Sequence, residues 1–209
     1  AVAKFRALRR IWAKVAKDRL GATASKTMAC RIGARISGSA ISYTEKPLNH
    51  SSRIAFQSLA AVMGGAQSID LASIDEAFGL PSEEARIFGL DTQHIITQET
   101  GVPLVADPLG GSYYVESLTN TIEQECLALL AEIDDIGGMW ECLKTGWLEE
   151  QFRKSTVSIQ KEINAGQRIV VGVNAFKGSN GPISDQIKDS AYPVPPAEER
   201  MEAVAKVKK

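Results

Sequence analysis

The sequence lacks the features that mark several large classes of protein. Its 24 Lys and Arg residues are balanced by 25 Asp and Glu residues, so the formal net charge is −1. A chain so close to neutral has no basic excess with which to bind nucleic acid or an anionic membrane surface. Cysteine is scarce, and Cys30, Cys126 and Cys142 form no CxxC pair. Their number and spacing indicate neither a disulfide framework nor a zinc site, so we expect a reducing, cytoplasmic compartment.

Long apolar runs are absent as well. No stretch approaches the roughly 18 apolar residues of a membrane-spanning helix. Residues 1–20 form a basic amphipathic segment without the apolar core of a secretory signal. The sequence opens within a predicted helix and without Met, so we expect it to be part of a longer polypeptide. What is present, 209 residues of which 44% are hydrophobic, suffices for one domain with a sizeable core.

Apolar spacing and turn residues predict a regular alternation of helices and strands. Helices are predicted over residues 3–19, 49–63, 82–99, 117–135, 139–145 and 147–164, and strands over residues 27–37, 67–73 and 102–106. Such alternation implies parallel strands joined by helical crossovers. Three strands cannot close a barrel of eight. Two architectures therefore remain, a small open sheet or part of a (β/α)8 barrel that other chain completes.

The last part of the chain differs in composition. Residues 168–174 are predicted to be a final strand or extended piece, and beyond Phe176 the chain is rich in Gly, Ser, Asn and Pro. This composition predicts a linker or wrapping arm that ends in a short charged helix over residues 198–209. We therefore divide the chain into an α/β domain, residues 1–164, for which both architectures remain open, and an extended arm, residues 165–209.

The first two predicted strands are unusually small and polar. Buried parallel strands are normally runs of Val, Ile and Leu. Here the strands and their ends carry Ala29, Gly33, Ala34, Ser37, Gly38, Ser39, Ala40, Gln67, Ser68, Asp70, Ala72 and Ser73. Such residues on an inner face would leave space and hydrogen-bonding groups for a thin, polar, chain-like ligand along a barrel axis. Alternatively, they are strand-end and loop residues, where small side chains are common.

The stretch from Gly101 to Asn120 carries the strongest signal of a ligand loop. A short apolar strand over residues 102–106 is followed by Asp107 and Pro108, then by a glycine-rich turn and an amphipathic helix. In α/β proteins, ligands bind where strands end and the next helices begin. This stretch is therefore the first place to look for a site.

Several long motifs occur in one order along residues 3–176. They read AKFRALRRIWA (3–13), AAVMGGAQS (60–68), IDEAFGLP (74–81), ARIFGLDTQHIITQETG (85–101), VADPLGGSYYVESLTN (105–120), EIDDIGGM (132–139) and INAGQRIVVGVNAF (163–176). Through these motifs the chain resembles the large, catalytic subunit of the methylmalonyl-CoA mutase family, whose members are adenosylcobalamin-dependent acyl-CoA mutases. The motifs are long and collinear, so the resemblance is specific.

The resemblance implies a TIM (β/α)8 barrel whose axis holds the pantetheine arm of coenzyme A. This chain would supply the last three strands and helices and the arm, and the first five strands would come from elsewhere. The family reaction is a radical 1,2-rearrangement of the carbon skeleton of an acyl-CoA. Its cobalt-binding His lies in a DxHxxG loop, and neither His50 nor His94 lies in such a motif. We therefore expect the cobalt ligand from a cobalamin-binding domain or subunit, within a homo- or hetero-oligomer.

Three residues are candidates for binding the substrate and its coenzyme A. Gln67 matches a glutamine that the family places near the substrate or the adenosyl group. Gln98 and Arg19 lie at helix ends and so, by resemblance, at the face where coenzyme A enters; Arg19 could meet a phosphate. The alternatives are a buried amide satisfied by the backbone for Gln67 and compensation of the helix dipole for Arg19.

Three further residues are candidates for binding the cofactor. Asp107 ends the third predicted strand, so the resemblance places it at the C-terminal mouth of the barrel, where a carboxylate could accept hydrogen bonds from ribose hydroxyls. Ser112 and Tyr113 lie in the glycine-rich loop that follows. The alternatives are an Asx cap for Asp107 and loop geometry or packing for the other two. His50 and His94 are expected to be structural or solvated.

The sequence departs from the family pattern at three places, so the identity of the acyl group of the substrate remains open. Residues 31–40 read RIGARISGSA where methylmalonyl-specific members have a pattern like RTHCQTSGW. Residues 69–72 read IDLA in place of LHTN, and DPLGG replaces DPWGG. Two rival functions also remain, a non-catalytic segment that completes the barrel of a partner and a coenzyme A-binding protein that uses no cobalamin.

Overall fold

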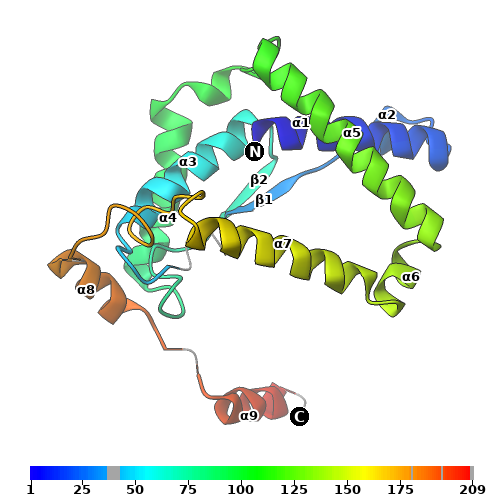
Figure 1. Cartoon of the computed structure of the whole chain (residues 1–209). Coiled ribbons are helices and arrows are strands. Elements are labelled where there is room, and N and C mark those ends of the chain that lie inside the picture. The colour runs from blue at the N-terminus through cyan, green and yellow to red at the C-terminus, as the bar shows by residue number, and fades with distance from the viewer. Residues whose placement is uncertain (37–42, 180, 194, 208–209) are drawn as a thin grey trace.

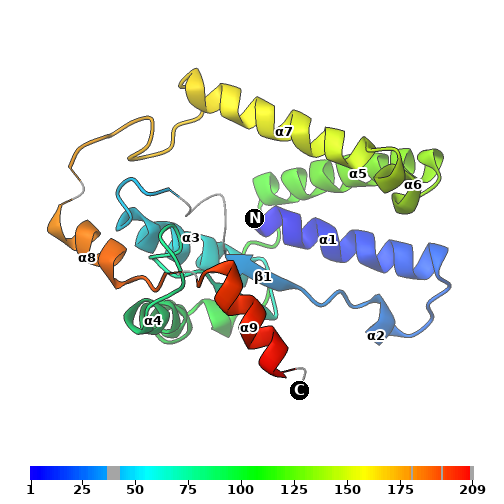
Figure 2. The same ribbon diagram turned by 90° about the horizontal axis from the view of Figure 1, so that it is seen from below.

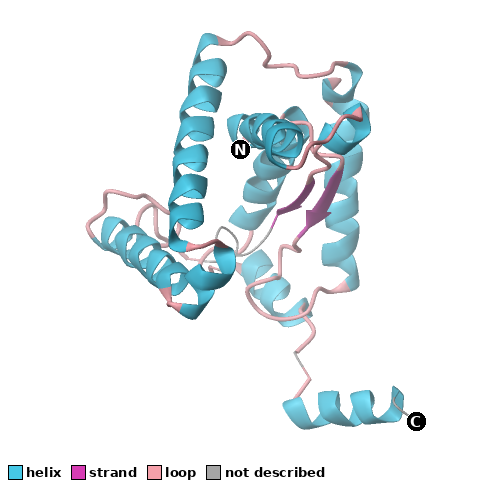
Figure 3. Ribbon diagram, turned by 90° about the vertical axis from the view of Figure 1, so that its right-hand side faces the viewer, coloured by secondary structure: helices cyan, strands magenta, loops and turns pink. Residues whose placement is uncertain are grey.

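The computed structural model describes residues 1–36, 43–179, 181–193 and 195–207, and Figure 1 shows helices gathered around one small sheet. In chain order the elements are α1 (Val2–Lys14), the π-helix η1 (Val15–Arg19), α2 (Ser25–Met28), β1 (Gly33–Ile36), α3 (Asn49–Met63), β2 (Ser68–Leu71), α4 (Glu83–Glu99), the 3-10 helix η3 (Val102–Leu104), α5 (Tyr113–Ile136), α6 (Met139–Lys144), α7 (Trp147–Asn164), α8 (Pro182–Ser190) and α9 (Ala197–Val207). Figure 3 shows how little strand accompanies the helices. The α/β class expected from the sequence is confirmed.

Local signals explain where the helices begin and end. The Ser82 Oγ accepts the Ala85 N–H at 3.2 Å and caps α4, as the Ser-Glu-Glu pattern predicts. Ser112 caps α5 in the same way, so this helix begins four residues before the predicted start at residue 117. Gly137, with a φ of 109°, ends α5 in the left-handed region that glycine adopts readily.

The two strands pair in parallel through the crossover helix α3. The register joins Gly33 to Ser68 and Ile36 to Leu71. One face of the pair is covered: Ala34 and Ile36 are buried against Ala61 of α3, with Phe5, Ala66, Ile69 and Leu71 packed around them. Alternation of side chains along a strand then turns the residues between them to the opposite face.

The prediction of a third strand at residues 102–106 is wrong, and the described part of the chain contains a two-stranded sheet. Residues 102–104 form the 3-10 helix η3, and Leu104 is 87% exposed. Pro103 has no N–H to donate to a sheet, and in this structure the segment does not lie along β2, so nothing stabilises the extended form. The first strand also begins later than predicted, because residues 25–28 form α2. The predicted strand residues 37–40 lie outside the described part of the chain.

The chain after α7 also departs from prediction. Residues 168–174 form a turn, because the Asn174 side chain donates to the carbonyls of Ile163 and Arg168 and accepts the Val170 N–H at 2.7 Å. The arm contains α8, which begins at Pro182 after Gly181. The backbone of Tyr192 then bridges to Leu80. The predicted terminal helix is present as α9, whereas α8 was not expected within the linker or wrapping arm.

Helices α1 and α5 lie side by side (Figures 1 and 2) and are joined mainly by charge. Basic residues recur at a helical spacing on α1 and meet acidic residues of α5 and of the loop before it. Arg6 pairs with Asp107 and, at 2.5 Å, with Glu116, while Arg10 and Lys14 both pair with Glu123, at 2.7 and 2.5 Å. None of the helices in the described ranges is both long and apolar enough to cross a bilayer.

Candidate functional site

The uncovered face of the sheet is small and polar, as expected for the inner face of such strands. It presents Gly33 and Arg35 of β1 and Ser68 and Asp70 of β2, all of them exposed. Arg35 Nε lies 3.3 Å from Asp70 Oδ2, and the two side chains remain 75% and 69% exposed. Ala34, one of the small residues assigned to this face, instead points to the covered side. The face therefore offers a cation, a carboxylate and a hydroxyl to a polar ligand.

Both outer edges of the two-stranded sheet lack a neighbouring strand in the described chain. Ile32 and Ile36 give their carbonyls to β2, accepting the N–H groups of Gln67 and Ala72 at 2.9 and 2.7 Å. Because the direction of backbone groups alternates along a strand, the N–H and C=O of Gly33 and Arg35 point to the opposite, open edge. A two-stranded parallel sheet is not normally stable by itself. The sheet therefore has the geometry of a part of a larger one.

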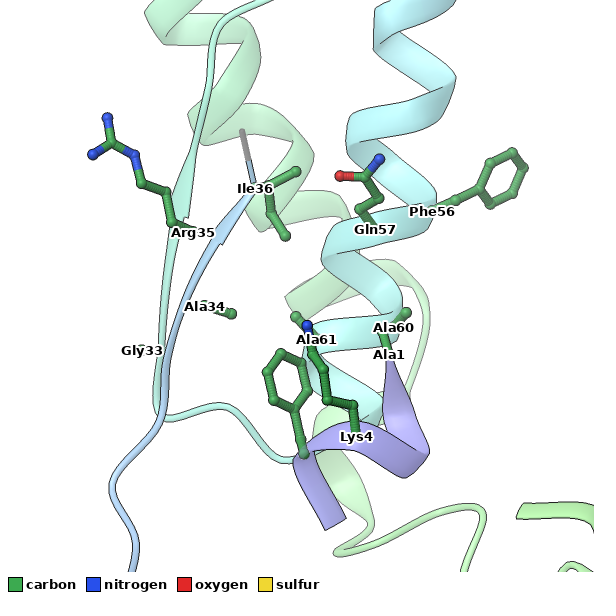
Figure 4. A pocket seen from close by; sticks show the side chains of 11 residues that line it. Ala1, Lys4, Gly33, Ala34, Arg35, Ile36, Phe56, Gln57, Ala60 and Ala61 are labelled. Carbon is green, nitrogen blue, oxygen red and sulfur yellow. The ribbon is translucent and has the colours of Figure 1, made fainter. Parts of the chain in front are cut away.

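A hollow of about 500 Å³ lies beside β1, between the covered face of the strand and helices α1 and α3. Figure 4 shows Ala34 and Ile36 pointing toward α3, whereas Arg35 points to the other side of the strand. Phe56 projects from α3 and is 72% exposed. The lining is mostly apolar, which suits packing against another element.

A second hollow, of about 700 Å³, lies between β2 and α4. Its floor includes Ile69 and Leu71, and Ser73 lies at its C-terminal end. Ser73 is 6% exposed, and its hydroxyl has no hydrogen-bond partner among the described residues. Nearby, Asp75 is fully buried and accepts the Ser82 N–H through Oδ2 at 2.9 Å.

Gln67 lies immediately before β2, at the N-terminal end of the sheet. Its Oε1 accepts the Ile32 N–H at 2.6 Å, and its Nε2 donates to the Gly65 carbonyl at 3.1 Å. The amide is thus satisfied by backbone groups, although Gln67 is exposed and not buried as the structural alternative supposed. It also ties the start of β1 to the turn before β2, and so helps to set the register of the two strands.

Asp107 lies in a tight turn with a φ of 49°, a conformation that few residues other than Gly, Asn and Asp adopt. Its carboxylate forms an ion pair with Arg6 and is 45% exposed. Arg6 also holds Glu116, which accepts the Gly111 N–H at 2.9 Å. The Gly111 N–H and the Arg6 guanidinium lower the pKa of Glu116 below its ordinary value. Sequence reasoning missed Arg6, although the basic spacing of α1 marks it.

The remaining candidate residues lie on separate elements. Arg19, at the end of η1, pairs with Asp134 near the end of α5, and Gln98 is exposed on the last turn of α4. Ser112 caps α5, its Oγ 3.5 Å from the Val115 N–H, and Tyr113 is 96% exposed. In the described chain no hydrogen bond or ion pair links any two of the six candidates. Arg19 thus has an ion-pair partner and Ser112 a capping contact within the chain, and a ligand-binding role for either residue stays a prediction.

The two histidines have very different surroundings. His50 of α3 is fully buried, its Nε2 lies 2.8 Å from the Tyr43 carbonyl, and Arg53 approaches its Nδ1 at 3.2 Å. These partners make Nε2 the donor and Nδ1 the acceptor, and burial lowers the pKa of the imidazole. His94 is exposed on α4. The described residues contain no group of three or more His, Cys, Asp or Glu side chains placed to hold a metal ion.

Parallel strands, a helical crossover and an open polar sheet face define a parallel α/β protein, and comparison with known proteins identifies its kind. The chain matches the methylmalonyl-CoA mutase family over residues 1–209. It is 41% identical over 175 residues to the 2-hydroxyisobutanoyl-CoA mutase large subunit of Aquincola tertiaricarbonis, covering 84% of this chain and 31% of that protein. It is 37% identical over 176 residues to the mitochondrial methylmalonyl-CoA mutase of Homo sapiens, covering 84% and 23%.

The chain belongs to the methylmalonyl-CoA mutase family. The family's enzymes are acyl-CoA mutases, a class of isomerase, and depend on adenosylcobalamin. A further relative, the methylmalonyl-CoA mutase large subunit of Porphyromonas gingivalis, is 35% identical over 84% of this chain. The chain spans 31% of the first of these three relatives, 23% of the second and 24% of the third.

The polar groups of this site fit part of what the family's cofactor needs. The Asp70 carboxylate can accept hydrogen bonds from hydroxyl groups, and the Ser73 hydroxyl, which has no partner among the described residues, can donate or accept one. A cobalt ligand is a different matter, because both ring nitrogens of His50 are engaged and His94 stands on an exposed helix surface. The described residues therefore fit contacts to the organic part of the cofactor, and a cobalt ligand from another domain or subunit stays a prediction.

Proposed function

We propose that this chain forms the C-terminal part of the (β/α)8 barrel of an adenosylcobalamin-dependent acyl-CoA mutase. Residues 1–164 would contribute barrel units, and residues 165–209 would form the arm. The observation that carries the proposal is the open sheet, because its polar face is uncovered while both strand edges lack partners. The family membership points to the same barrel.

The reaction proposed is a radical 1,2-rearrangement of the carbon skeleton of a branched acyl-CoA. Adenosylcobalamin supplies the radical chemistry when it is bound. The residues of this chain would bind and orient the polar chain of the substrate and exclude water. Arg35, Ser68 and Asp70 are placed to do this, since their side chains stand together on the face that would become the barrel interior.

The candidate residues divide between the two ends of the proposed barrel. Gln67 lies at the N-terminal end of the strands, and this position supports a role near the substrate. Gln98 and Arg19 are proposed to contact coenzyme A. Asp107, Ser112 and Tyr113 are proposed to lie on the cofactor side once the barrel is complete. Tyr113 is free to do so, because it is almost wholly exposed.

Partners follow from the same proposal. The remaining barrel strands and a cobalamin-binding domain or subunit must come from beyond these residues. Two relatives are named as large subunits, which supports a partner subunit and an oligomer. One relative acts on 2-hydroxyisobutanoyl-CoA by name and others on methylmalonyl-CoA, so both acyl groups are candidates. The cytoplasmic location stays a prediction, since some relatives are named as mitochondrial.

One observation favours a second candidate, a structural segment that completes the barrel and contacts no ligand. Arg19, Gln67 and Asp107 all have partners within the chain, and these contacts suffice to explain them. The exposed pair Arg35–Asp70 distinguishes the two functions, because a purely structural segment has no use for it.

Reconstitution tests the proposal. This chain is combined with polypeptide that carries the remaining barrel strands and the cobalamin domain, then supplied with adenosylcobalamin and a set of branched acyl-CoAs. We expect isomerised product and a change in the visible spectrum on substrate addition. Asp70→Asn should abolish most product, whereas Glu141→Gln, which removes an exposed partner of Lys144 on α6, should not. Assembly without product or spectral change from any acyl-CoA would contradict the mutase function and leave the two rivals, a structural segment or a coenzyme A-binding protein that uses no cobalamin.

A further inference from the structure

The ion pair on the open face of the sheet is incompletely satisfied. Arg35 Nε lies 3.3 Å from Asp70 Oδ2, and Figure 4 shows the Arg35 side chain pointing away from α3. In the described part of the chain, neither side chain makes a further hydrogen bond or ion pair. A guanidinium has five N–H donors and a carboxylate has about four acceptor sites, so most of both remain available. The pair can therefore donate to a ligand and accept from it at the same place.

The position of the pair along the strands relates it to one end of a bound substrate. Arg35 and Asp70 are each the third residue of a four-residue strand, and they are aligned in register. Ser68 lies on the same face two residues earlier, about 7 Å nearer the N-terminal end. In the proposed barrel, coenzyme A enters at the N-terminal end and the cofactor lies at the C-terminal end. The pair thus stands nearer the acyl group, and Ser68 stands nearer the pantetheine chain.

The charges around the pair are balanced. Among the described residues that line the hollow between β2 and α4, two are cations, Arg35 and Arg86, and two are carboxylates, Asp70 and Glu76. The lining therefore has no formal net charge, and a ligand that brings a further negative charge finds no positive excess. An acyl carboxylate that approached Arg35 would also meet the like charge of Asp70.

A hydroxyl group matches both members of the pair. It has one O–H to donate and two lone pairs to accept with, so it can donate to Asp70 and accept from Arg35 without adding charge. Hydrogen bonds with one charged partner are stronger than those between neutral groups. An ionised carboxylate has no donor for Asp70. A purely aliphatic acyl group has neither donor nor acceptor and would leave the charged groups without compensation once the completed barrel excludes water.

We infer that Arg35 and Asp70 select the acyl group, favouring branched acyl-CoAs that carry a hydroxyl over those that carry a second carboxylate or no polar group. The inference rests on the proposed function, because only a completed barrel brings an acyl-CoA to this face. Both residues lie in stretches that depart from the methylmalonyl-specific pattern, Arg35 at the position of a glutamine and Asp70 at that of a histidine. The departures thus place a donor and an acceptor side by side.

Binding of three coenzyme A thioesters tests the preference. Calorimetry is performed on the complex of this chain with polypeptide that carries the remaining barrel strands and the cobalamin domain, without adenosylcobalamin. 2-Hydroxyisobutanoyl-CoA and isobutanoyl-CoA differ only in the hydroxyl, and methylmalonyl-CoA carries a carboxylate. We expect the hydroxylated thioester to bind at least about tenfold more tightly than either of the others. Equal affinities for the three thioesters would overturn the inference.

Substitutions at the two residues should move the preference in opposite directions. Asp70→Asn removes the charge that repels a carboxylate and weakens the acceptor for a hydroxyl, so the affinity ratio of the hydroxylated to the carboxylated thioester should fall by about tenfold or more. Arg35→Gln removes the cation and leaves Asp70 to repel a carboxylate, so the same ratio should rise by about threefold or more.

Ser68→Ala provides the matched control on the same face. Ser68 lies nearer the pantetheine chain, which the three thioesters share, so its substitution should change all three affinities by the same factor. A merely structural role of the ion pair predicts the same uniform change for Asp70→Asn and Arg35→Gln. A uniform change in these two variants, or shifts of the ratio in the same direction, would overturn the inference.

The binding test is separate from that of the mutase reaction, because no cofactor is added and no turnover is needed. A complex that shows the expected preferences but forms no product would lose the mutase reaction and keep the selectivity of the pair. A mutase that forms product, while both substitutions leave the affinity ratio unchanged, would keep the function and lose the inference. A complex that binds none of the three thioesters would contradict both.

Discussion

Arg35 Nε lies 3.3 Å from Asp70 Oδ2, and the two residues face each other on neighbouring parallel strands. The side chain of Arg35 is 75% exposed and that of Asp70 is 69% exposed. Their backbones are paired in register. An ion pair this exposed contributes little to stability. Two charged side chains on the uncovered face of a sheet whose other face is apolar are better explained by a ligand, so the pair supports the proposed function.

The first prediction separates stability from activity at this pair. Asp70→Asn should lower the free energy of unfolding by no more than about 1 kcal/mol, because the pair is screened by water. In the reconstituted mutase the same change should lower kcat/KM by on the order of tenfold or more, because a desolvated contact to the ligand is lost. Denaturant unfolding and steady-state kinetics measure the two effects. A loss confined to stability would assign Asp70 a structural role.

The second prediction concerns the charged contact between α1 and α5. Glu123 is 5% exposed and lies between Arg10 and Lys14. Glu123→Gln leaves two cations without their carboxylate, so the free energy of unfolding should fall by about 1–3 kcal/mol. Glu125, exposed on another side of α5, provides the control. Unfolding in urea of the two glutamine variants gives the comparison, and equal stabilities would show that the ion pairs do not hold the helices together.

The third prediction follows from the buried histidine. Burial lowers the pKa of His50 in the folded chain, so the unfolded chain binds more protons below an ordinary pKa of about 6.5. Stability contributed by neutral His50 is therefore full above about pH 6.5 and falls as the pH drops below it. His50→Gln, which can still donate to Tyr43, should flatten the fall in Tm between about pH 7 and pH 5. His94→Gln should leave that fall unchanged, since His94 is exposed.

The fourth prediction distinguishes a cap from a ligand contact at Ser112. Ser112→Ala should cost about 0.5–2 kcal/mol of stability, toward the lower end because the bond to Val115 N–H is 3.5 Å long. Ser112→Asp should restore stability, because Asp also caps helices. If Ser112 also contacts the cofactor, the Ser112→Asp variant will be as stable as the original chain, but the reconstituted mutase will have a lower kcat. Full activity in the Asp variant would limit Ser112 to capping α5.

The helices could be predicted because their signals are local. The apolar spacing of α3 and the Ser82 cap of α4 lie within a few residues of the backbone they control. Both strands of the pair were also foreseen, at residues 27–37 and 67–73. In the described chain they are shorter, β1 covering Gly33–Ile36 and β2 covering Ser68–Leu71. Alternation along a strand fixes which side chains share a face, so a polar face could be foreseen. That this face is the inner face of a barrel stays a prediction.

What could not be predicted depends on partners far along the chain. The segment after Gly101 has the composition of a strand, but a strand forms only where backbone groups pair with it, and here Arg6 draws Asp107 away. The turn at residues 168–174 depends on the Asn174 side chain, and α8 follows a Gly-Pro start within an otherwise loop-like composition. The ligand-binding roles of all six candidates stay predictions, namely those of Arg19, Gln67, Gln98, Asp107, Ser112 and Tyr113.

The most direct test of the central claim is amide hydrogen exchange at the open edge of β1. Gly33 and Arg35 point their N–H groups toward the side where no strand pairs with them in the described chain. When polypeptide carrying the remaining barrel strands is added, their exchange should slow by at least about tenfold, because a new strand bonds to that edge. Amides of α7 should change little. Unchanged exchange at Gly33 and Arg35 in a complex that has formed would show that the sheet is not completed there, contradicting the barrel assignment.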